Sequence, residues 1–497
     1  MSLKEVENQI KQVREYIKDN LLDEALSLMQ NIISNKEYAT NEMVMLEMGQ
    51  VFLAKENFQE SQIWFKKVLD QNKDNIYAIK SMLRVSYNLE DYENVLVYIK
   101  KIIPEREKFH NDVSDMINFL FIKLFKYKEI DDEHKIRSII NILVFCNEYI
   151  KDYKLKNILI NELEILNKEV ILKSKPRVAV ISMTSRCNIK CKMCKIPSEH
   201  WDFPNHKKQE IFNLFPSLQK VIWHGGEPFL YPDIDDMIVE AGKYGVNQVI
   251  STNGLLLSKE RIKKIVNSKM ELNISIHGLE KEVYESIHYG GKFDLLLKNL
   301  ETIKEIINQS KLYMKYGLKF LLMKSNYKHL NKLYDFALKY GFNHVYVNTL
   351  GYDTINEENF IHHYKDTGII ENVIENSKIL SDKFKKADIL YEAWLPELCE
   401  HKNEVKQEKE SVVEPKFCCY MPWQSIVINT DGVIQNNCYC ENLILGNINE
   451  DTIEDIWNND KIIEIRKNII KDGFDEKCSL DCKNKRISSS FLKNPVG

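Results

Sequence analysis

The sequence predicts three parts in order: an all-α array of helical repeats, an α/β domain built on a parallel sheet, and a small cysteine-rich domain. Three observations lead to this prediction. The first 170 of the 497 residues contain one glycine and one proline, strand-like and helical runs alternate from Pro176 onward, and six of the eleven cysteines lie after residue 416. We expect the three parts at residues 1–170, 176–400 and 417–497, with a charged linker at 401–416.

Composition and charge exclude several classes of protein. The net charge is only -4, from 69 Lys and Arg against 73 Asp and Glu, so the chain lacks the basic excess typical of nucleic-acid binding. No apolar run reaches the ~18 residues that a membrane span needs. The first 20 residues form a charged helical pattern without the apolar core of a signal peptide. We therefore expect a cytoplasmic protein that binds neither nucleic acid nor membrane.

A repeat of 34 residues runs through the helical part. Glu56-Asn57-Phe58 recurs as Glu90-Asp91-Tyr92. Small and apolar positions recur with a similar spacing in three sets: Leu22, Ala25, Met29 and Ile32; Ser61, Phe65 and Val68; Val95, Ile99 and Ile102. This period resembles tetratricopeptide (TPR) repeats, in which each helical hairpin buries its apolar face against the next. Lys73 stands where that repeat ends in proline, and an unrelated helical array is the alternative.

The central part alternates short apolar runs with amphipathic helices such as 232–244, 259–268 and 294–310. Repeated strand–helix units favour a parallel sheet or barrel. Six units are fewer than the eight of a complete TIM barrel, so we expect a partial (β/α)6 TIM-like barrel. The predicted strands are 178–183, 220–224, 247–252, 272–277, 318–323 and 344–349.

Cys187, Cys191 and Cys194 lie in one predicted loop after the first of these strands. Clustered cysteines in a reducing compartment indicate metal more than disulfides. Spacings of three and two residues allow one loop to hold a cubic [4Fe–4S] cluster and leave its fourth iron open to another ligand. Zinc and free thiols are the alternatives, although paired Cys-x-x-Cys knuckles are more typical of zinc.

The cysteine triplet resembles the CxxxCxxC signature of the radical S-adenosylmethionine (SAM) superfamily, with Met193 where the family usually has an aromatic residue. The resemblance implies that the open iron binds SAM and that SAM is cleaved to a 5′-deoxyadenosyl radical, which takes a hydrogen atom from a substrate C–H bond. It also implies a flavodoxin- or ferredoxin-type electron donor. Met193 is expected beside the cofactor.

Further motifs follow in the family's order at the ends of the predicted strands. Gly225-Gly226-Glu227-Pro228 resembles the GGEP motif that holds the SAM amino group. Thr252 and Asn253 end the third strand, where the family contacts the ribose and methionine, and Ser275 ends the fourth. His288 stands where the family has arginine. Each motif alone is a common turn, and their order together supports the family.

The last segment resembles the auxiliary-cluster domain called SPASM and its shorter twitch form. The matching stretches begin at Cys419 (CYMPW), Asn429 (NTDG), Leu445 (LGN) and Cys478 (CSLDC). The resemblance implies one auxiliary [4Fe–4S] cluster, because too few cysteines remain for two. Its expected ligands are Cys419, Cys438, Cys478 and Cys482. Cys418 is an alternative to Cys419 and Cys440 to Cys438, and structural zinc on the same sulfurs is the alternative to a cluster.

The expected function is the modification of a peptide or protein by oxidation, cross-linking or epimerisation, with the helical array as a peptide-binding surface. The alternatives are a small-molecule dehydrogenase or epimerase acting on a sugar-like alcohol, and a non-catalytic repeat scaffold. The intact cysteine triplet and GGEP argue against the scaffold. Cys440 is a candidate hydrogen donor, because a weak S–H bond can return a hydrogen atom to a carbon radical.

Overall fold

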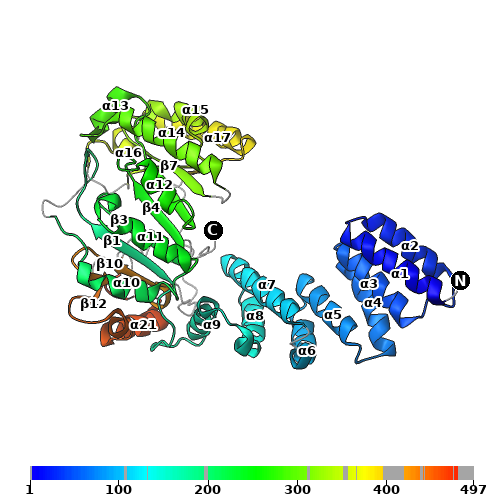
Figure 1. Cartoon of the computed structure of the whole chain (residues 1–497). Coiled ribbons are helices and arrows are strands. Elements are labelled where there is room, and N and C mark those ends of the chain that lie inside the picture. Colours follow the sequence, from blue (N-terminus) through cyan, green and yellow to red (C-terminus); the bar gives the residue numbers. More distant parts are fainter. Residues whose placement is uncertain are drawn as a thin grey trace. The chain divides into compact units, whose positions relative to one another are not determined.

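The computed structural model describes residues 3–105, 109–130, 132–194, 200–310, 314–350, 356–364, 367–395, 419–436, 440, 443–473 and 475–478. Two compact units divide the chain, Met1–Leu159 and Ile160–Gly497 (Figure 1). The predicted linker at 401–416 lies outside the described residues, as do four of the cysteines: Cys399, Cys418, Cys438 and Cys482.

The first unit is all-helical, as predicted. The repeat positions Ala25, Met29, Ile32, Ser61, Phe65, Val68, Val95, Ile99 and Ile102 are all 0% exposed, so the period in the sequence marks the buried face of three helices, the second helix of each of the first three hairpins. Its helices are α1 (Leu3–Lys18), α2 (Leu22–Ser34), α3 (Glu42–Ala54), α4 (Phe58–Gln71), α5 (Ile76–Asn88), α6 (Tyr92–Ile102), η1 (Ile103–Glu105), α7 (His110–Glu129), α8 (Glu133–Phe145) and η2 (Asn147–Tyr149). A further helix, α9 (Tyr153–Leu166), runs from this unit into the second.

The first three helical hairpins share one turn geometry. Each turn contains one residue in the left-handed conformation: Asn20 (φ 60°), Glu56 (φ 57°) and Glu90 (φ 60°). In the second and third hairpins the next residue, Asn57 or Asp91, caps the following helix by accepting a hydrogen bond from its first turn. The repeated turn explains why the sequence period reappears as stacked hairpins (Figure 1).

The second unit is built on a sheet of ten strands in the order β12-β11-β10-β1-β3-β4-β5-β7-β8-β9. All six predicted strands are present, and all neighbours from β10 to β9 are parallel. The strands are β1 (Val178–Thr184), β3 (Lys220–Gly225), β4 (Asn247–Thr252), β5 (Met270–Ser275), β7 (Lys315–Leu322), β8 (His344–Thr349), β9 (Leu390–Trp394), β10 (Ser425–Ile428), β11 (Val433–Gln435) and β12 (Ile444–Asn447). Two short strands, β2 (Lys190–Cys191) and β6 (His288–Tyr289), form a separate antiparallel pair.

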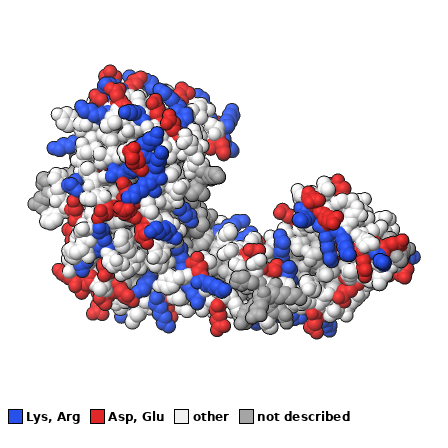
Figure 2. Space-filling view, viewed as in Figure 1, with Lys and Arg blue, Asp and Glu red and all other residues white. Residues whose placement is uncertain are grey.

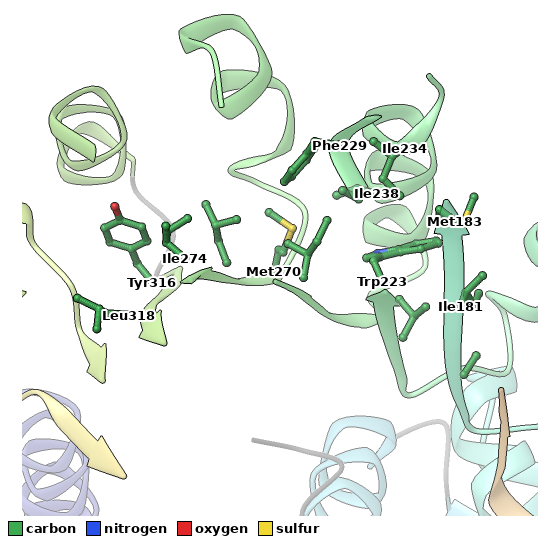
Figure 3. Packing of buried hydrophobic residues seen from close by; sticks show 14 of the residues in the cluster. Ile181, Met183, Trp223, Phe229, Ile234, Ile238, Met270, Ile274, Tyr316 and Leu318 are labelled. Carbon is green, nitrogen blue, oxygen red and sulfur yellow. The ribbon is translucent and has the colours of Figure 1, made fainter. Parts of the chain in front are cut away.

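Helices pack on one face of this sheet around a large apolar core. In Figure 3, Trp223 of β3 lies near Ile238 of α11, and Ile274 of β5 lies near Tyr316 of β7. The helices of this unit are η3 (Asn205–Lys207), α10 (Lys208–Leu214), η4 (Pro228–Leu230), α11 (Ile234–Lys243), α12 (Lys259–Ile265), α13 (Lys281–Ile287), α14 (Phe293–Gln309), η5 (Tyr327–Lys332), α15 (Leu333–Tyr340), α16 (Phe360–Tyr364), α17 (Ile369–Lys386), α19 (Met421–Gln424), α20 (Ile453–Trp457) and α21 (Asp460–Asp472).

The cysteine-rich segment extends the central sheet. β10 pairs in parallel with β1, from Val178 opposite Ser425 to Ile181 opposite Ile428. The stretch 453–472 contains two helices, α20 and α21, because the Asn459 side chain accepts the main-chain N–H of Ile462 and starts α21 anew. The first strand of the α/β domain therefore has the C-terminal segment on one side and β3 on the other.

Two buried arginines hold this junction together. Arg177 and Glu162 form an ion pair of 2.6 Å in which both side chains are 2% exposed. Arg466 of α21 is fully buried, and burial lowers its pKa to about 9. Its guanidinium donates to main-chain oxygens on three different segments: Pro422, Val170 and Trp457. These bonds attach α21 to the segment that precedes β1 as well as to its own domain.

Charged residues of both signs are interspersed on the face of the molecule shown in Figure 2, without an extended area of one sign. In the described part of the chain no helix combines the length and the apolar character that crossing a bilayer requires.

Candidate active site

The predicted motifs follow four adjacent strands of the sheet, β1, β3, β4 and β5. Gly225 pairs with Thr184, and Thr252 pairs with Ile274, so the four strands end at similar heights. Because the strands are parallel, the segments that follow them lie at one edge of the sheet, where barrel enzymes have their active sites. Ser275 is the last residue of β5 at this edge.

Gly225 and Gly226 lie directly against the start of the cysteine loop. The N–H of Gly226 donates to the main-chain oxygen of Thr184 at 2.7 Å, and the N–H of Glu227 donates to that of Arg186 at 2.8 Å. A Cβ atom would lie 2.2 Å from the Thr184 oxygen at position 225 and 2.3 Å from the Arg186 oxygen at position 226. Only glycine permits this approach, so the pair positions the loop that carries Cys187.

The carboxylate of Glu227 is turned toward the segment after β4. It is 1% exposed. Oε1 accepts from the Thr252 hydroxyl at 2.8 Å, and Oε2 accepts from the main-chain N–H of Asn253 at 2.9 Å. Burial raises the pKa of Glu227. Both oxygens thus hold protein groups and join two motif loops, while the contact of Glu227-Pro228 with the SAM amino group stays a prediction.

Asn253 connects the segment after β4 to the cysteine loop. Its Nδ2 donates to Asn188 Oδ1 at 2.7 Å and lies 4.0 Å from Cys187 Sγ. Its Oδ1 accepts the N–H of Leu255 at 3.0 Å, which fixes the orientation of the amide. Thr252 and Asn253 are both buried, whereas Asn188 is exposed, so the contacts of the Asn253 amide with the cysteine loop are partly shielded from water.

Cys187 and Cys191 are half-buried and Cys194 is exposed. Cys191 stands opposite His288 in the β2–β6 pair, with 3.2 Å between its Sγ and Nδ1 of the imidazole. Burial raises the pKa of all three thiols, that of Cys191 to about 12. Because the thiolate is the form that binds metal, loading this loop releases protons.

The donor set of the loop fits an iron–sulfur cluster. Three thiols lie within eight residues, and Nδ1 of His288 and Nδ2 of Asn253 lie near two of the sulfurs. Such outer hydrogen bonds are typical of metal-bound thiolates. Among the described residues, no three His, Cys, Asp or Glu side chains converge as ligands of a single metal ion do. Each cysteine of a cubic cluster binds its own iron, so its sulfurs need not converge. Met193 is half-buried in this loop.

Two histidines form a layer behind Cys191. The ring of His288 stacks on that of His277 at 4.9 Å and packs against Tyr284 at 4.5 Å. Burial lowers the pKa of His288 to about 4 and that of His277 well below its ordinary value. The sequence identified position 288 as a departure from the family pattern. It did not indicate the contact with Cys191, which arises from a pairing of two-residue strands.

The sheet face opposite the helices carries polar side chains that the sequence analysis missed. Lys319 Nζ donates to the Ser251 hydroxyl at 2.8 Å, and the Tyr346 hydroxyl donates to Glu271 Oε1 at 3.0 Å. Burial lowers the pKa of Lys319. Lys319 lies between buried Leu318 and Phe320, and this alternation was the signal that could have placed it on the inner face.

Three of the cysteines considered for the auxiliary cluster lie in the described residues. Cys419 and Cys478 are half-buried, and Cys440 is 9% exposed within the apolar core. The predicted ligands Cys438 and Cys482 lie outside the described residues. The ligand set therefore stays a prediction, as does the choice between Cys438 and Cys440.

Comparison with known families agrees with this geometry. Residues 181–319 match the family model of the Radical SAM superfamily. Residues 418–483 match that of SPASM, an iron–sulfur cluster-binding domain. The chain therefore contains a radical SAM domain and a SPASM domain, and these two domains imply SAM and [4Fe–4S] clusters, one of them auxiliary, as cofactors.

Curated relatives share about a quarter of their residues with the matched parts of this chain. Fe-coproporphyrin III synthase of Methanosarcina barkeri is 26% identical over 44% of this chain and 56% of its own length, so the match spans little more than half of that relative. The tungsten-containing aldehyde ferredoxin oxidoreductase cofactor-modifying protein of Pyrococcus furiosus is 25% identical over 63% of this chain and 88% of its own. The probable GTP 3',8-cyclase of Sulfurisphaera tokodaii is 26% identical over 59% and 90%.

Solved structures that align with this chain include SuiB of Streptococcus suis bound to precursor peptide SuiA. The TM-score is 0.48 at 18% identity, over 62% of this chain and 70% of that one. Another is anSMEcpe with bound AdoMet, with a TM-score of 0.45 at 16% identity, over 63% and 85%.

Proposed function

We propose that this radical SAM enzyme modifies a peptide or protein. The observation that carries the proposal is the hydrogen-bonded connection of the cysteine loop to the GGEP segment and to Thr252-Asn253-Gly254, the TNG segment, at the edge of a sheet whose inner face is polar. Bound cluster and SAM would together supply an electron and a 5′-deoxyadenosyl radical that takes a hydrogen atom from the substrate.

The residues of this chain have separate tasks in the proposal. Cys187, Cys191 and Cys194 hold the cluster. The Gly225-Gly226 backbone allows close approach at the SAM site, and Glu227 and Asn253 keep the loops in register. The hydrogen bonds of Glu227 and Asn253, here called the clamp, fix the distances between the motif loops. This matters because reacting groups must be held within a fraction of an ångström for efficient reaction.

The inner face of the sheet favours a polar substrate. Lys319, Glu271 and Tyr346 lie there, and an apolar ligand covering them would take these groups out of water without offering hydrogen bonds. A peptide backbone offers both donors and acceptors. The helical hairpins of the first unit add the kind of surface that binds extended peptides in repeat proteins.

A small-molecule substrate is the second candidate. The names of the relatives above refer to GTP and to Fe-coproporphyrin III, which are small molecules. A dehydrogenase or epimerase acting on a sugar-like alcohol belongs to this class and would use the same polar inner face.

The test uses the full chain, reconstituted anaerobically with iron and sulfide and supplied with SAM and a reductant. Two fractions of a cell extract are added separately, one of peptides and one of protein-free small molecules. We expect 5′-deoxyadenosine to rise above background with the peptide fraction, together with a peptide of changed mass. A rise with the small-molecule fraction alone would support the second candidate. If the 5′-deoxyadenosine formed does not exceed that of a Cys187→Ala/Cys191→Ala/Cys194→Ala variant, both candidate functions are excluded. Cys146→Ala in the first unit is the matched control.

Turnover in deuterated water distinguishes epimerisation from oxidation once a substrate is found. If Cys440 returns a hydrogen atom, one product carbon gains solvent deuterium, and Cys440→Ala abolishes this with both clusters intact. A product two mass units lighter than the substrate, formed equally well by Cys440→Ala, would assign oxidation or cross-linking and exclude this role for Cys440.

A further inference from the structure

We propose that His288 is a positioning residue for the cluster: its Nδ1–H donates a hydrogen bond to the sulfur of Cys191 and raises the reduction potential of the cluster in this loop. The inference rests on the proposed function, because it requires that the loop bind a cluster.

Main-chain pairing places the imidazole beside the sulfur. In the β2–β6 pair, Cys191 stands opposite His288 and Lys190 opposite Tyr289. The N–H of Lys192 donates to the oxygen of Ile287 at 3.0 Å and continues the pairing. The 3.2 Å between His288 Nδ1 and Cys191 Sγ is thus set by the backbone on both sides.

The second ring nitrogen fixes which atom carries the hydrogen. The main-chain N–H of His277 donates to Nε2 of His288 at 3.2 Å. A nitrogen that accepts a hydrogen bond carries no hydrogen, so the hydrogen of the neutral ring is on Nδ1. A metal-bound thiolate has no hydrogen to give and can only accept. Once the loop holds a cluster, the direction of the bond is therefore from Nδ1 to Sγ.

The surroundings hold the ring in this orientation. His288 is 1% exposed, and its ring packs between partners at 4.9 Å (His277) and 4.5 Å (Tyr284). His277 is itself anchored, because its Nδ1 accepts the N–H of Leu321 at 3.1 Å and its oxygen accepts from Asn326 Nδ2 at 2.7 Å. A hydrogen bond shielded from water in this way is stronger than an exposed one.

Electrostatics gives the sign of the effect. Reduction adds negative charge to the cluster, and a donor aimed at one of its sulfurs stabilises the reduced form more than the oxidised form. We expect about a tenfold change in the equilibrium constant for reduction, which is ~59 mV for one electron. The result is a cluster that accepts an electron from its donor more readily.

The experiment measures potentials in the full-length protein carrying its clusters. His288→Phe keeps a stacked ring and removes the donor, whereas His288→Asn retains an amide N–H near the Nδ1 position. A redox titration follows the electron paramagnetic resonance signal that changes on addition of SAM. We expect the reduction equilibrium to fall about tenfold in His288→Phe and to return toward wild type in His288→Asn. His206→Phe, at an exposed position, is the control and should match wild type.

An unchanged potential in His288→Phe with full iron content overturns the inference and leaves the proposed function intact. A wild-type loop that binds no iron overturns both. If His288→Phe cannot hold the cluster, the test uses the wild-type protein labelled with ¹⁵N-histidine. Pulsed electron paramagnetic resonance should then detect coupling between a histidine nitrogen and the reduced cluster. Absence of this coupling overturns the inference.

Discussion

Asn253 and Cys187 belong to different loops and lie together at the strand ends, with 4.0 Å between Nδ2 and Sγ. The main-chain N–H of the same asparagine is held by Oε2 of Glu227 at 2.9 Å. The GGEP segment, the TNG segment and the cysteine loop therefore form one hydrogen-bonded unit. A substitution in one of them should alter the geometry of the other two.

Glu227→Gln tests this connection. The amide replaces one carboxylate oxygen by an NH₂ group. This group then faces either the Thr252 hydroxyl or the Asn253 N–H, whose hydrogen bond the lost oxygen accepted. Leaving such buried groups unpaired costs about 1–3 kcal/mol, so we expect SAM to bind at least ~5-fold more weakly. Isothermal titration calorimetry measures this, with Glu240→Gln on the outer helix α11 as control. Equal SAM affinity in both variants would show that the clamp is dispensable.

Iron content tests the assignment of the cysteines. Two cubic clusters require about eight irons, and replacing Cys187, Cys191 and Cys194 by alanine should leave about four and abolish SAM cleavage. Iron and sulfide analysis, combined with chromatography of 5′-deoxyadenosine, measures both. Cys146→Ala, at a buried position in the first unit, should keep all the iron. SAM cleavage by the triple variant would contradict the assignment.

The auxiliary cluster should be separable from SAM cleavage. Cys478→Ala or Cys482→Ala should lose about four irons while 5′-deoxyadenosine still forms, because the cysteines predicted to hold the SAM-binding cluster lie in a separate loop. Product formation should fall sharply, since the substrate radical loses its electron acceptor. Elemental analysis provides the decisive comparison: zinc in place of iron at these cysteines would rule out a redox role.

The buried ion pair behind β1 should be essential to stability. Glu162→Gln leaves the guanidinium of Arg177, 2% exposed, without its charge partner, and breaking such pairs costs about 3–5 kcal/mol. Calorimetric unfolding should show this loss, whereas Glu169→Gln at a nearby exposed position should unfold like wild type. The double variant Arg177→Met/Glu162→Met should be more stable than Glu162→Gln, because no charge is left buried alone.

Glu90 should make the first unit sensitive to acid. Its hydrogen bond with Lys123, followed by one with Tyr127, lowers the pKa of Glu90 from 4.5 to about 2. Because the folded value is the lower one, the stabilisation is complete above pH 4.5 and is lost as the pH falls toward 2. Glu90→Gln should thus lower the unfolding temperature at pH 7 and matter less near pH 2. The exposed Glu93→Gln serves as control, and a Glu90→Gln effect independent of pH would contradict the account.

The strand pattern was accessible from the sequence where short runs are rich in β-branched residues. Runs such as 178–183 and 247–252 contain Val and Ile and became β1 and β4. The edge strand β9 (Leu390–Trp394) was missed, because it has a helix before it and alternates exposed with half-buried residues without any β-branched side chain.

Contacts between distant segments could not be read from patterns of this kind. The cysteine spacing indicated a metal loop, but the neighbourhood of Cys191 depends on His288, almost a hundred residues away and in a strand of two residues. In the same way the run from Ser425 predicts a strand, and nothing in it specifies β1 as its partner. Local periodicity identifies elements, whereas register depends on the whole fold.

The parallel pairing of β10 with β1 sets an order of events during synthesis on the ribosome. β1 ends at Thr184, but the strand that covers its free edge begins only at Ser425. At a synthesis rate of ~5–20 residues per second, that edge stays unpaired for roughly 10–50 s after it leaves the ribosome. An open strand edge is a template for pairing with other chains. Nascent chains shorter than about 425 residues should therefore depend most on chaperones, and a premature stop before β10 should give an aggregating product even though the SAM motifs are complete.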